Sequence, residues 1–470
     1  MTAATIAPAF GRRRGTEFAL IVFAIVLTLT AYAATGLAHN KHLPTDMVTY
    51  GLGLVALFGV AHLVVRRFAP YADPLLLPIA AALNGLGLVV IWRLDLAADD
   101  SARAAHRALP RGAAPMQLLW MCLGVALFIG VLVAVRDHRR LRSYSYTAMV
   151  VGLALLVLPA VLPASHSVVN GARIWVRFGA FSFQPGEIAK IALEIFFAGY
   201  LVRHRDLLRL AGRRVWRIDL PRARDLGPLL LAWGASLLVL IRESDLGSSL
   251  LFFGIFLVML YVATERGSWL LLGLVLFVVG SVLAYYTIGH VHDRFTAWLD
   301  PFNNKVYDRT PGGSYQLDQG LFGMATGGIT GTGLGQGRPN LVPFANTDFI
   351  MASVGEELGL VGVMGILTCY LLFVGRGLRA AIGARDGFGK LLATGLAFTF
   401  ALQVFVQVGG VTRLIPLTGL TLPFLSYGGS SLVTNWVLLA LLLRISDAGR
   451  RPLAPPAPTP DENATVVVRQ

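Results

Sequence analysis

Long apolar stretches follow one another along most of the chain, separated by short polar segments. A helix needs about 17 to 25 mostly apolar residues to cross the hydrocarbon core of a bilayer, and about twelve stretches meet this requirement. They are residues 17–36, 47–66, 74–94, 115–135, 144–163, 186–202, 226–242, 248–264, 268–289, 349–375, 388–410 and 429–446. The pattern predicts an all-α, polytopic membrane protein with about twelve transmembrane helices.

The composition supports this prediction and excludes a soluble globular enzyme. Charged residues make up 14% of the 470 residues, against about 25% in soluble domains, and the mean hydropathy is +0.66. The 40 Lys and Arg residues exceed the 26 Asp and Glu residues by 14. In a membrane protein, an excess of basic residues is first expected in the cytoplasmic loops. The positive charge therefore does not indicate nucleic-acid binding, and we expect no nucleic-acid partner. The two cysteines lie in apolar runs, which argues against a disulfide framework or a zinc site.

The distribution of arginine predicts the orientation. The basic segments 66–67, 136–142, 203–225, 376–390 and 444–451 all fall on one side if every span crosses the membrane, and the positive-inside rule makes that side cytoplasmic. Both termini then lie inside. The first span follows three arginines and lacks a small-residue cleavage site, so we interpret it as a retained signal anchor. The proline-rich end, 451–470, reads as a disordered cytoplasmic tail.

Two segments outside the membrane are long enough to hold a site, 164–190 and 290–348. Ordinary connections have about 4 to 6 residues. The longer segment contains Trp298 to Phe302, Gly312 to Gln316 and a glycine-dense run from Gly323 to Gly337. Glycines let backbone N–H groups approach a ligand, although a glycine-rich run alone is weak evidence. The aromatic residues and glycine turns favour an ordered loop.

Three ionisable residues fall on one face of the predicted helix that opens with Gln184 and Pro185. Glu187, Lys190 and Glu194 are three and four positions apart. Such side chains are costly inside a bilayer unless they are paired or face water, and they indicate a functional cavity by default. A self-neutralising structural ion network is the alternative. In a cavity, Lys190 could hold a phosphate of a lipid-linked substrate.

Other candidate residues have a structural alternative as well. Arg173, just before this helix, is either a site cation or a headgroup anchor, and so is Arg177. Asp245 could line a cavity or cap the helix that begins near Ser248. Asp348, at the membrane boundary, suits a general base and equally an N-cap, and the residues alone favour the cap.

Two further features lie near the predicted membrane boundary. Glu356 and Glu357 belong to the predicted helix after Asp348, where unpaired carboxylates are expensive, so they line a cavity or pair with arginine. The segment from Arg413 to Ser431 is interrupted by proline and glycine, which predicts a broken or re-entrant helix buried in protein. An irregular outer loop is the alternative.

These motifs resemble the SEDS family of bacterial cell-shape, elongation, division and sporulation proteins. The resemblance runs from Trp175 to Arg444 through five ordered motifs, and it is greatest for the actinobacterial members of the elongation branch. It divides the chain into N-terminal helices over 1–163, of which the first two exceed the usual family core, a catalytic membrane core over 164–450 and the tail over 451–470.

The resemblance implies a peptidoglycan polymerase, with roles for particular residues. The family's Thr-Asp-Phe motif places the proposed catalytic aspartate at Asp348, against the preference for an N-cap. The implied substrate-binding residues are Lys190, Glu187, Arg173, Asp245, Glu356, Tyr315, Gln316 and Ser430.

The chain departs from the family pattern at several positions. Ile174 takes the second basic place of the Gly-Ala-basic-Arg-Trp motif, and Arg177 could substitute for it. Ser244 replaces a proline, and Asn346 stands where many members have histidine. The unusual residues in the long loop are Asp318 and Gly320.

The implied reaction is inverting glycosyl transfer from undecaprenyl pyrophosphate onto lipid II at the outer membrane face. Asp348 would accept the proton of the attacking sugar hydroxyl, and Lys190, Arg173 or a divalent cation such as Mg²⁺ or Mn²⁺ would neutralise the pyrophosphate. The resemblance implies the bacterial inner membrane, the nascent glycan chain as a ligand, and a class B penicillin-binding protein and other elongation or division proteins as partners. A septal polymerase and a non-catalytic lipid II flippase are the alternatives.

Overall fold

The computed structural model describes residues 14–168, 173–179, 181–209, 213–215, 218–220, 227, 230, 231, 233–235, 237, 238, 245–309 and 312–452. Within them, ten helical segments are long and apolar enough to span a membrane. They are α1 (Arg14–Asn40), α2 (Met47–Phe68), α3 (Leu76–Ala104), α4 (Ala113–Ala134), η1 (His138–Tyr144) with α5 (Ser145–Val161), α9 (Leu246–Thr264), α10 (Ser268–Thr287), α14 (Ile350–Gly383), α15 (Gly387–Val411) and α16 (Gly429–Arg450).

These ten segments coincide with ten of the predicted spans. An eleventh predicted span, 186–202, also forms a long helix, α7 (Pro185–Arg209), although its charged residues make it less apolar. The span predicted at 226–242 lies largely outside the described residues. The all-α polytopic architecture is therefore confirmed, whereas the count of twelve stays a prediction. Most of the predicted tail 451–470 also lies outside the described residues.

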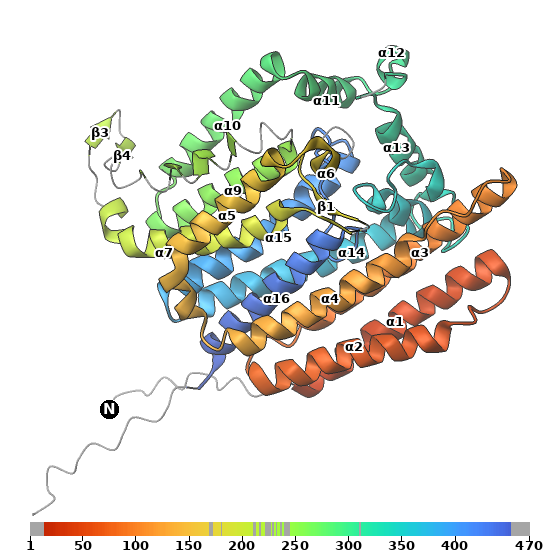
Figure 1. Ribbon diagram of the computed structural model, residues 1–470, viewed down its shortest axis with the longest axis horizontal. Coiled ribbons are helices and arrows are strands. Elements are labelled where there is room, and N and C mark those ends of the chain that lie inside the picture. Colours follow the sequence, from red (N-terminus) through yellow and green to blue (C-terminus); the bar gives the residue numbers. More distant parts are fainter. Residues whose placement is uncertain are drawn as a thin grey trace, which may run out of the picture.

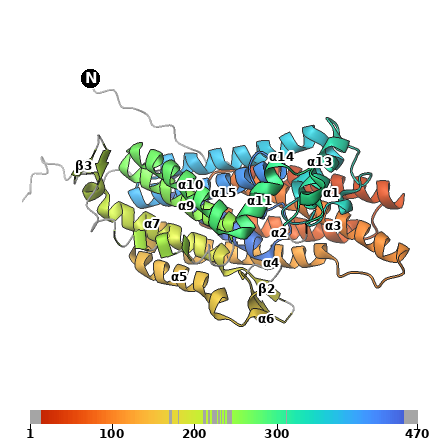
Figure 2. The same ribbon diagram turned by 90° about the horizontal axis from the view of Figure 1, so that it is seen from above.

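The helices pack as one bundle around α3, α15 and α16. These three are the most deeply buried of the ten candidate spans. Trp436 of α16 is fully buried, and its ring contacts Phe128 and Phe424 edge-on at centroid distances of 5.6 and 5.4 Å. In Figures 1 and 2 the pair α1 and α2 lies at the opposite edge of the bundle from α9 and α10. The many exposed apolar side chains on these outer helices form a lipid-facing surface.

Short β-hairpins occur between helices. Strands β1 (Val176–Phe178) and β2 (Phe181–Phe183) pair antiparallel, with Val176 opposite Phe183. Strands β3 (Arg213–Val215) and β4 (Ile218–Leu220) form a second hairpin. The first hairpin leads directly into α7 and so fixes where that helix begins.

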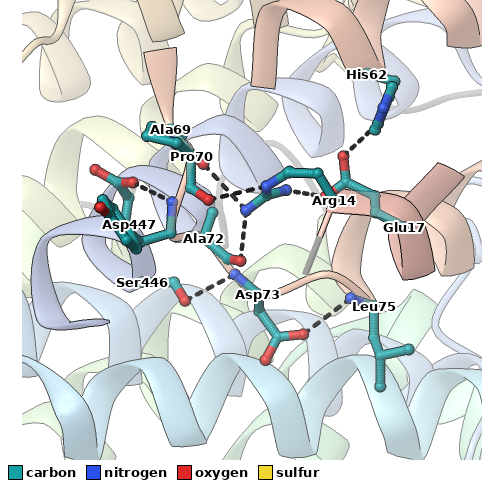
Figure 3. A network of polar contacts seen from close by, with 11 residues as sticks. Arg14, Glu17, His62, Ala69, Pro70, Ala72, Asp73, Leu75, Ser446 and Asp447 are labelled. Atoms are coloured by element: carbon teal, nitrogen blue, oxygen red, sulfur yellow. Dashed lines mark hydrogen bonds and ion pairs between the residues drawn. The ribbon is translucent and has the colours of Figure 1, made fainter. Parts of the chain in front are cut away.

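A polar cluster joins the N-terminal helices to the end of α16 (Figure 3). The Arg14 guanidinium donates to the carbonyl oxygens of Ala69 and Ala72, at 3.1 and 2.6 Å. The Asp447 carboxylate accepts from the Tyr71 backbone N–H at 2.8 Å. Fully buried Asp73 forms ion pairs with the guanidinium groups of Arg376 and Arg450.

Four of the arginine-rich segments assigned to the cytoplasm meet at this end of the bundle. Arg444 donates to Phe68 O at 2.5 Å and also to Leu132 O, while His138 and Asp386 lie 2.8 Å apart. The segments 66–67, 136–142, 376–390 and 444–451 therefore lie on one side, as predicted.

The opposite end carries the ordered segment 290–348. It contains α11 (Gly289–Leu299), α12 (Asn304–Tyr307), α13 (Tyr315–Gly327) and the short η2 (Pro339–Leu341), which Figure 1 shows together along one end of the bundle. The Arg413 guanidinium donates to Trp298 O and Leu299 O, both at 2.9 Å. This contact fastens α11 to the connection between α15 and α16.

That connection, 412–428, is described throughout and forms no helix. Leu422, Phe424 and Leu425 within it are nevertheless fully buried. The predicted break in regular structure is present. Residues 422–426 are buried in protein, as predicted, whereas 412–419 are partly exposed, as the alternative of an outer loop expects.

Candidate functional site

The predicted ionic face of α7 turns toward α15. The Lys190 Nζ and Glu187 Oε2 atoms lie 2.8 Å apart, and Lys190 also donates to Gln403 Oε1 at 3.2 Å. One turn deeper, the Thr399 hydroxyl donates to the Glu194 carboxylate. All three α7 side chains are buried. Pairing therefore offsets much of their desolvation cost, as the structural alternative requires, and it holds the Lys190 side chain near the outer end of α7.

The start of α7 is fixed by Ser430. The Ser430 hydroxyl oxygen accepts from the Gln184 backbone N–H at 2.7 Å, and the side chain is buried. Ser430 thus positions the first turn of α7, and through it Glu187 and Lys190. Its assignment to substrate binding stays a prediction.

Asp245 caps α9. Its Oδ1 accepts from the Ser248 backbone N–H at 2.9 Å, which confirms the capping alternative. Burial raises the pKa of Asp245, although its hydrogen bonds to Ser248 and the positive charge of Lys190 oppose the rise. The two charges are near enough to interact, so the cap also belongs to the polar cluster around α7.

Asp348 does not cap α14. The N-cap position is Phe349, without a side-chain hydrogen bond to the helix among the described residues. The Asp348 Oδ1 instead accepts from the Thr347 hydroxyl at 3.0 Å. Burial raises the pKa of Asp348, while Thr347, Arg294 and Gln316 oppose that rise by stabilising the ionised form. The carboxyl is thus a better proton acceptor than a solvent-exposed aspartate, while its neighbours still favour the ionised form.

The backbone around Asp348 is held by α15 and by the irregular segment after it. The Gln407 amide donates to Asp348 O at 2.5 Å. The Ser426 hydroxyl donates to Thr347 O at 2.5 Å, and the Tyr427 N–H donates to Asn346 O at 2.7 Å. Asn346 makes this contact through its backbone carbonyl. The contact therefore does not require the histidine side chain that many family members have at this position.

Arg294 of α11 connects the two acidic residues and was missed by the sequence analysis. It donates to Leu417 O at 2.5 Å. Burial lowers the pKa of Arg294, and the charges of Asp348 and Asp245 oppose that change. The available signal was a single arginine in a largely aromatic and apolar segment four positions before Trp298. Arg294 is thus a partly buried cation that interacts with both carboxylates.

Of the remaining predicted site residues, Gln316 lies beside Asp348, whereas Tyr315 and Arg173 contact other segments. The Gln316 amide donates to Pro343 O at 3.2 Å and also interacts with the Asp348 carboxylate. Tyr315, at the start of α13, is exposed and contacts the Tyr307 ring edge-on. Arg173 is occupied elsewhere, because it donates to Leu162 O at 2.5 Å and to Ser167 Oγ at 3.2 Å. The structure therefore brings Gln316 to Asp348 and uses Arg173 to fold the segment after α5.

The two glutamates of α14 lie against the loop after α13, because α14 breaks at Gly359, which has φ 64° and ψ −168°. Glu357 pairs with Arg93 at 2.9 Å, which confirms the predicted pairing with arginine. Glu356 accepts from the Arg338 N–H at 2.5 Å. The glycine-run N–H groups of Gly331, Gly333 and Gly335 are used internally, for contacts with Gly327 and Glu357.

The unusual loop residues also have structural roles. Asp318 is buried and accepts from the Ser314 hydroxyl at 3.3 Å. A Cβ at Gly320 would lie 2.7 Å from the Phe349 ring, so glycine permits α13 to approach the start of α14 beside Asp348. Ser244 lies outside the described residues.

No metal-binding group of three or more His, Cys, Asp or Glu side chains occurs within the part of the chain that the structure describes. Among the described residues, Arg294 is the cation that acts on Asp348, and Lys190 acts on the neighbouring Asp245. Chemically, the cluster offers a carboxyl that can accept a proton, beside positive charge that can stabilise an anion.

Comparison with known proteins identifies close relatives. The family model for the FtsW, RodA and SpoVE cell cycle proteins matches residues 74–451. The chain is 51% identical to the peptidoglycan glycosyltransferase RodA of Mycobacterium tuberculosis (strain ATCC 25618 / H37Rv) over 448 residues, which cover 95% of this chain and 93% of that protein. It is 34% identical to the probable peptidoglycan glycosyltransferase FtsW of Geobacter metallireducens over 390 residues, covering 80% of this chain and 94% of that protein.

A solved structure has the same fold. A chain from a peptidoglycan synthase complex that coordinates polymerization and crosslinking is 27% identical, with a TM-score of 0.62, and the match covers 81% of this chain and 99% of that one. The family match begins just before α3, so α1 and α2 lie outside it, as the sequence predicted, whereas the alignment to the mycobacterial protein covers nearly the whole chain.

Proposed function

The chain belongs to the FtsW/RodA/SpoVE family of cell cycle proteins, and we propose that it is a peptidoglycan glycosyltransferase of the elongation type. It transfers the growing glycan chain from undecaprenyl pyrophosphate onto lipid II at the outer face of the membrane. Identity of 51% to a RodA protein, against 34% to an FtsW protein, supports elongation over septal synthesis.

The placement of Asp348 carries this proposal. Inverting transfer needs a base on the acceptor side, and Asp348 takes the proton from the attacking 4-hydroxyl group. Burial raises its pKa, which makes the carboxylate a stronger base. Gln407, Thr347 and Ser426 hold its backbone and side chain, so the base is positioned before substrate binds.

Positive charge beside the base serves the leaving group. Pyrophosphate departs as an anion and needs countercharge rather than a proton. We assign this role to Arg294 and Lys190, which lie near Asp348 and Asp245 in the same polar cluster. A divalent cation bound with the substrate's pyrophosphate would add to this charge. Glu187 holds the Lys190 ammonium group in place.

The cellular setting follows from the same proposal. The protein lies in the bacterial inner membrane with both termini in the cytoplasm, because the arginine-rich ends of the helices meet on one side. Its partner is a class B penicillin-binding protein that cross-links the product. Support comes from the similar chain in a complex that coordinates polymerization and crosslinking.

The test uses purified protein, with and without its transpeptidase partner, and fluorescent lipid II. Wild type should yield glycan ladders on a gel. Asp348→Asn should lower the initial rate by about 10²- to 10⁴-fold, as expected for loss of a general base. Asp300→Asn is the matched control, because Asp300 contacts Asn303 in the same outer segment.

Each outcome separates the alternatives. Ladders that persist in Asp348→Asn and vanish in Asp300→Asn would move the base to Asp300. Ladders of undiminished intensity in both variants would refute an aspartate base in this segment. A wild-type protein that binds its partner, makes no ladders and moves lipid II across vesicle membranes would instead be a flippase.

A further inference from the structure

A cavity with a mixed polar and apolar lining lies at the outer end of the molecule, between α13, the loop after it and the start of α14. Its volume is about 270 Å³. At about 30 Å³ for each water molecule, it has room for a single sugar ring. The residues that line it include Gln319, Phe322, Thr332, Gln336, Arg338 and Glu356.

A buried carboxylate forms the floor of this outer cavity. Glu356 is 5% exposed, and its Oε1 accepts from the Arg338 backbone N–H at 2.5 Å. A Cβ at Gly323 would lie 3.2 Å from Oε2, and a Cβ at Gly337 would lie 3.0 Å from Oε1. Glycine at both positions lets the backbone approach the carboxylate closely without a side chain in contact with its oxygens. Its oxygens can accept hydrogen bonds from a ligand's hydroxyl or amide groups.

The rim combines an aromatic ring with amide and hydroxyl groups. Phe322 is half exposed and stacks on Phe302 with a centroid distance of 6.0 Å. The apolar face of a pyranose ring can pack on such a ring, while Gln319, Gln336 and Thr332 reach its polar substituents. Arg338 is exposed at the edge and can pair with a carboxylate carried by the sugar.

The walls of the cavity are firmly held. The N–H groups of Thr332 and Gly333 donate to the carbonyls of Glu356 and Glu357, at 2.9 and 3.0 Å. The Arg93 guanidinium donates to Gly337 O at 2.8 Å while it pairs with Glu357. These contacts make the loop part of a rigid frame built on α3 and α14, which suits a binding site.

The cavity lies along α13 from Asp348. Gln316, in the first turn of that helix, interacts with Asp348, and Phe322 is six residues further along. At 1.5 Å per residue this separation is about 9 Å, the scale of a short oligosaccharide. A glycan chain that ends at the base could therefore reach the cavity.

We propose that this cavity binds an N-acetylated sugar unit of the glycan strand, with Arg338 pairing with a carboxylate of its peptide stem. This inference rests on the proposed polymerase function and extends it. By holding the strand after each transfer, the cavity keeps the product bound for the next addition. Its occupancy sets the length of the strands.

The experiment compares wild type with the double variant Phe322→Ala/Arg338→Ala, both assayed as the complex with the transpeptidase. The changed side chains are exposed, and the Arg338 backbone N–H that bonds Glu356 is retained. The matched control is Ile329→Ala/Lys305→Ala, which removes an exposed apolar and an exposed cationic side chain outside the cavity. Strand length is measured at equal lipid II consumption, and binding of a soluble disaccharide-peptide fragment is measured separately.

The double variant should shorten the mean strand by about fivefold and weaken fragment binding by a similar factor, as for the loss of an aromatic or arginine contact. The control should match wild type in both. Equal strand length and equal fragment binding in wild type and the double variant would overturn the inference. If wild type makes no polymer but binds the fragment, and the double variant does not bind it, the proposed function fails while the sugar site stands.

Discussion

Removing one partner of the buried ion pair between Arg93 and Glu357 should strongly destabilise the outer end of the bundle. The paired atoms are 2.9 Å apart, and the side chains are 6% and 5% exposed. Arg93→Met leaves the Glu357 carboxylate buried, with the Gly335 N–H at 3.0 Å as its remaining side-chain contact. Stranding one partner of a buried pair costs about 3–5 kcal/mol, and we expect that loss in the free energy of unfolding.

A double variant separates the charge effect from the lost packing. In Arg93→Met/Glu357→Gln the buried charge is gone, and the glutamine oxygen can still accept from Gly335. The remaining cost is the unpaired Gly337 carbonyl, about 1–3 kcal/mol. The double variant should therefore be more stable than Arg93→Met alone by about 2 kcal/mol.

The assay is unfolding of the purified protein in mixed micelles with increasing SDS, followed by tryptophan fluorescence. Arg103→Met is the control on the same helix, because Arg103 pairs with Asp100 and both are more than half exposed. It should change stability by less than about 1 kcal/mol. A loss of under about 1 kcal/mol in Arg93→Met, or a double variant less stable than the single one, would refute the reasoning.

Three other predictions concern the base, the helix break and the cytoplasmic cluster. Since the proposed base Asp348 must be ionised to accept a proton, activity should fall as the pH drops through its raised pKa. Arg294→Met removes a charge that lowers this pKa, so it should move the acidic limb of the rate profile to higher pH; an unmoved limb would contradict the placement. Gly359→Ala should destabilise the protein by more than about 1–3 kcal/mol, because its Cβ would lie 2.3 Å from a backbone nitrogen. The control is Gly365→Ala, which has open space around it and should be tolerated in the same SDS unfolding assay. Asp73→Ala should remove one ion pair from each of two arginines and lower the yield of monodisperse protein in size-exclusion chromatography; a normal yield and unchanged unfolding would show that the pairs contribute little.

The sequence determined the membrane architecture because the relevant physics is local. Whether a stretch can cross the bilayer depends on its own length and polarity, and ten predicted spans form helices of the required kind. The face shared by Glu187, Lys190 and Glu194 follows from the helical repeat alone. The ordered motifs identified the family and, through it, predicted a catalytic role for Asp348. In each case the information lies within a few consecutive residues.

Only the tertiary structure decided how the site is assembled. Gln407 and Ser426 contact the backbone of Asp348 and Thr347 from 59 and 79 positions away, and Arg294 reaches Leu417 across 123 positions. No periodicity predicts such pairs, because they depend on which helices pack together.

The same limit explains the errors and the open alternatives. The residues alone favoured a cap at Asp348, whereas the structure has Phe349 at the N-cap position. Arg173 was expected in the site, and its guanidinium donates to the Leu162 carbonyl after α5. The type of a polar residue determines its chemistry, whereas the surrounding fold determines which groups it contacts.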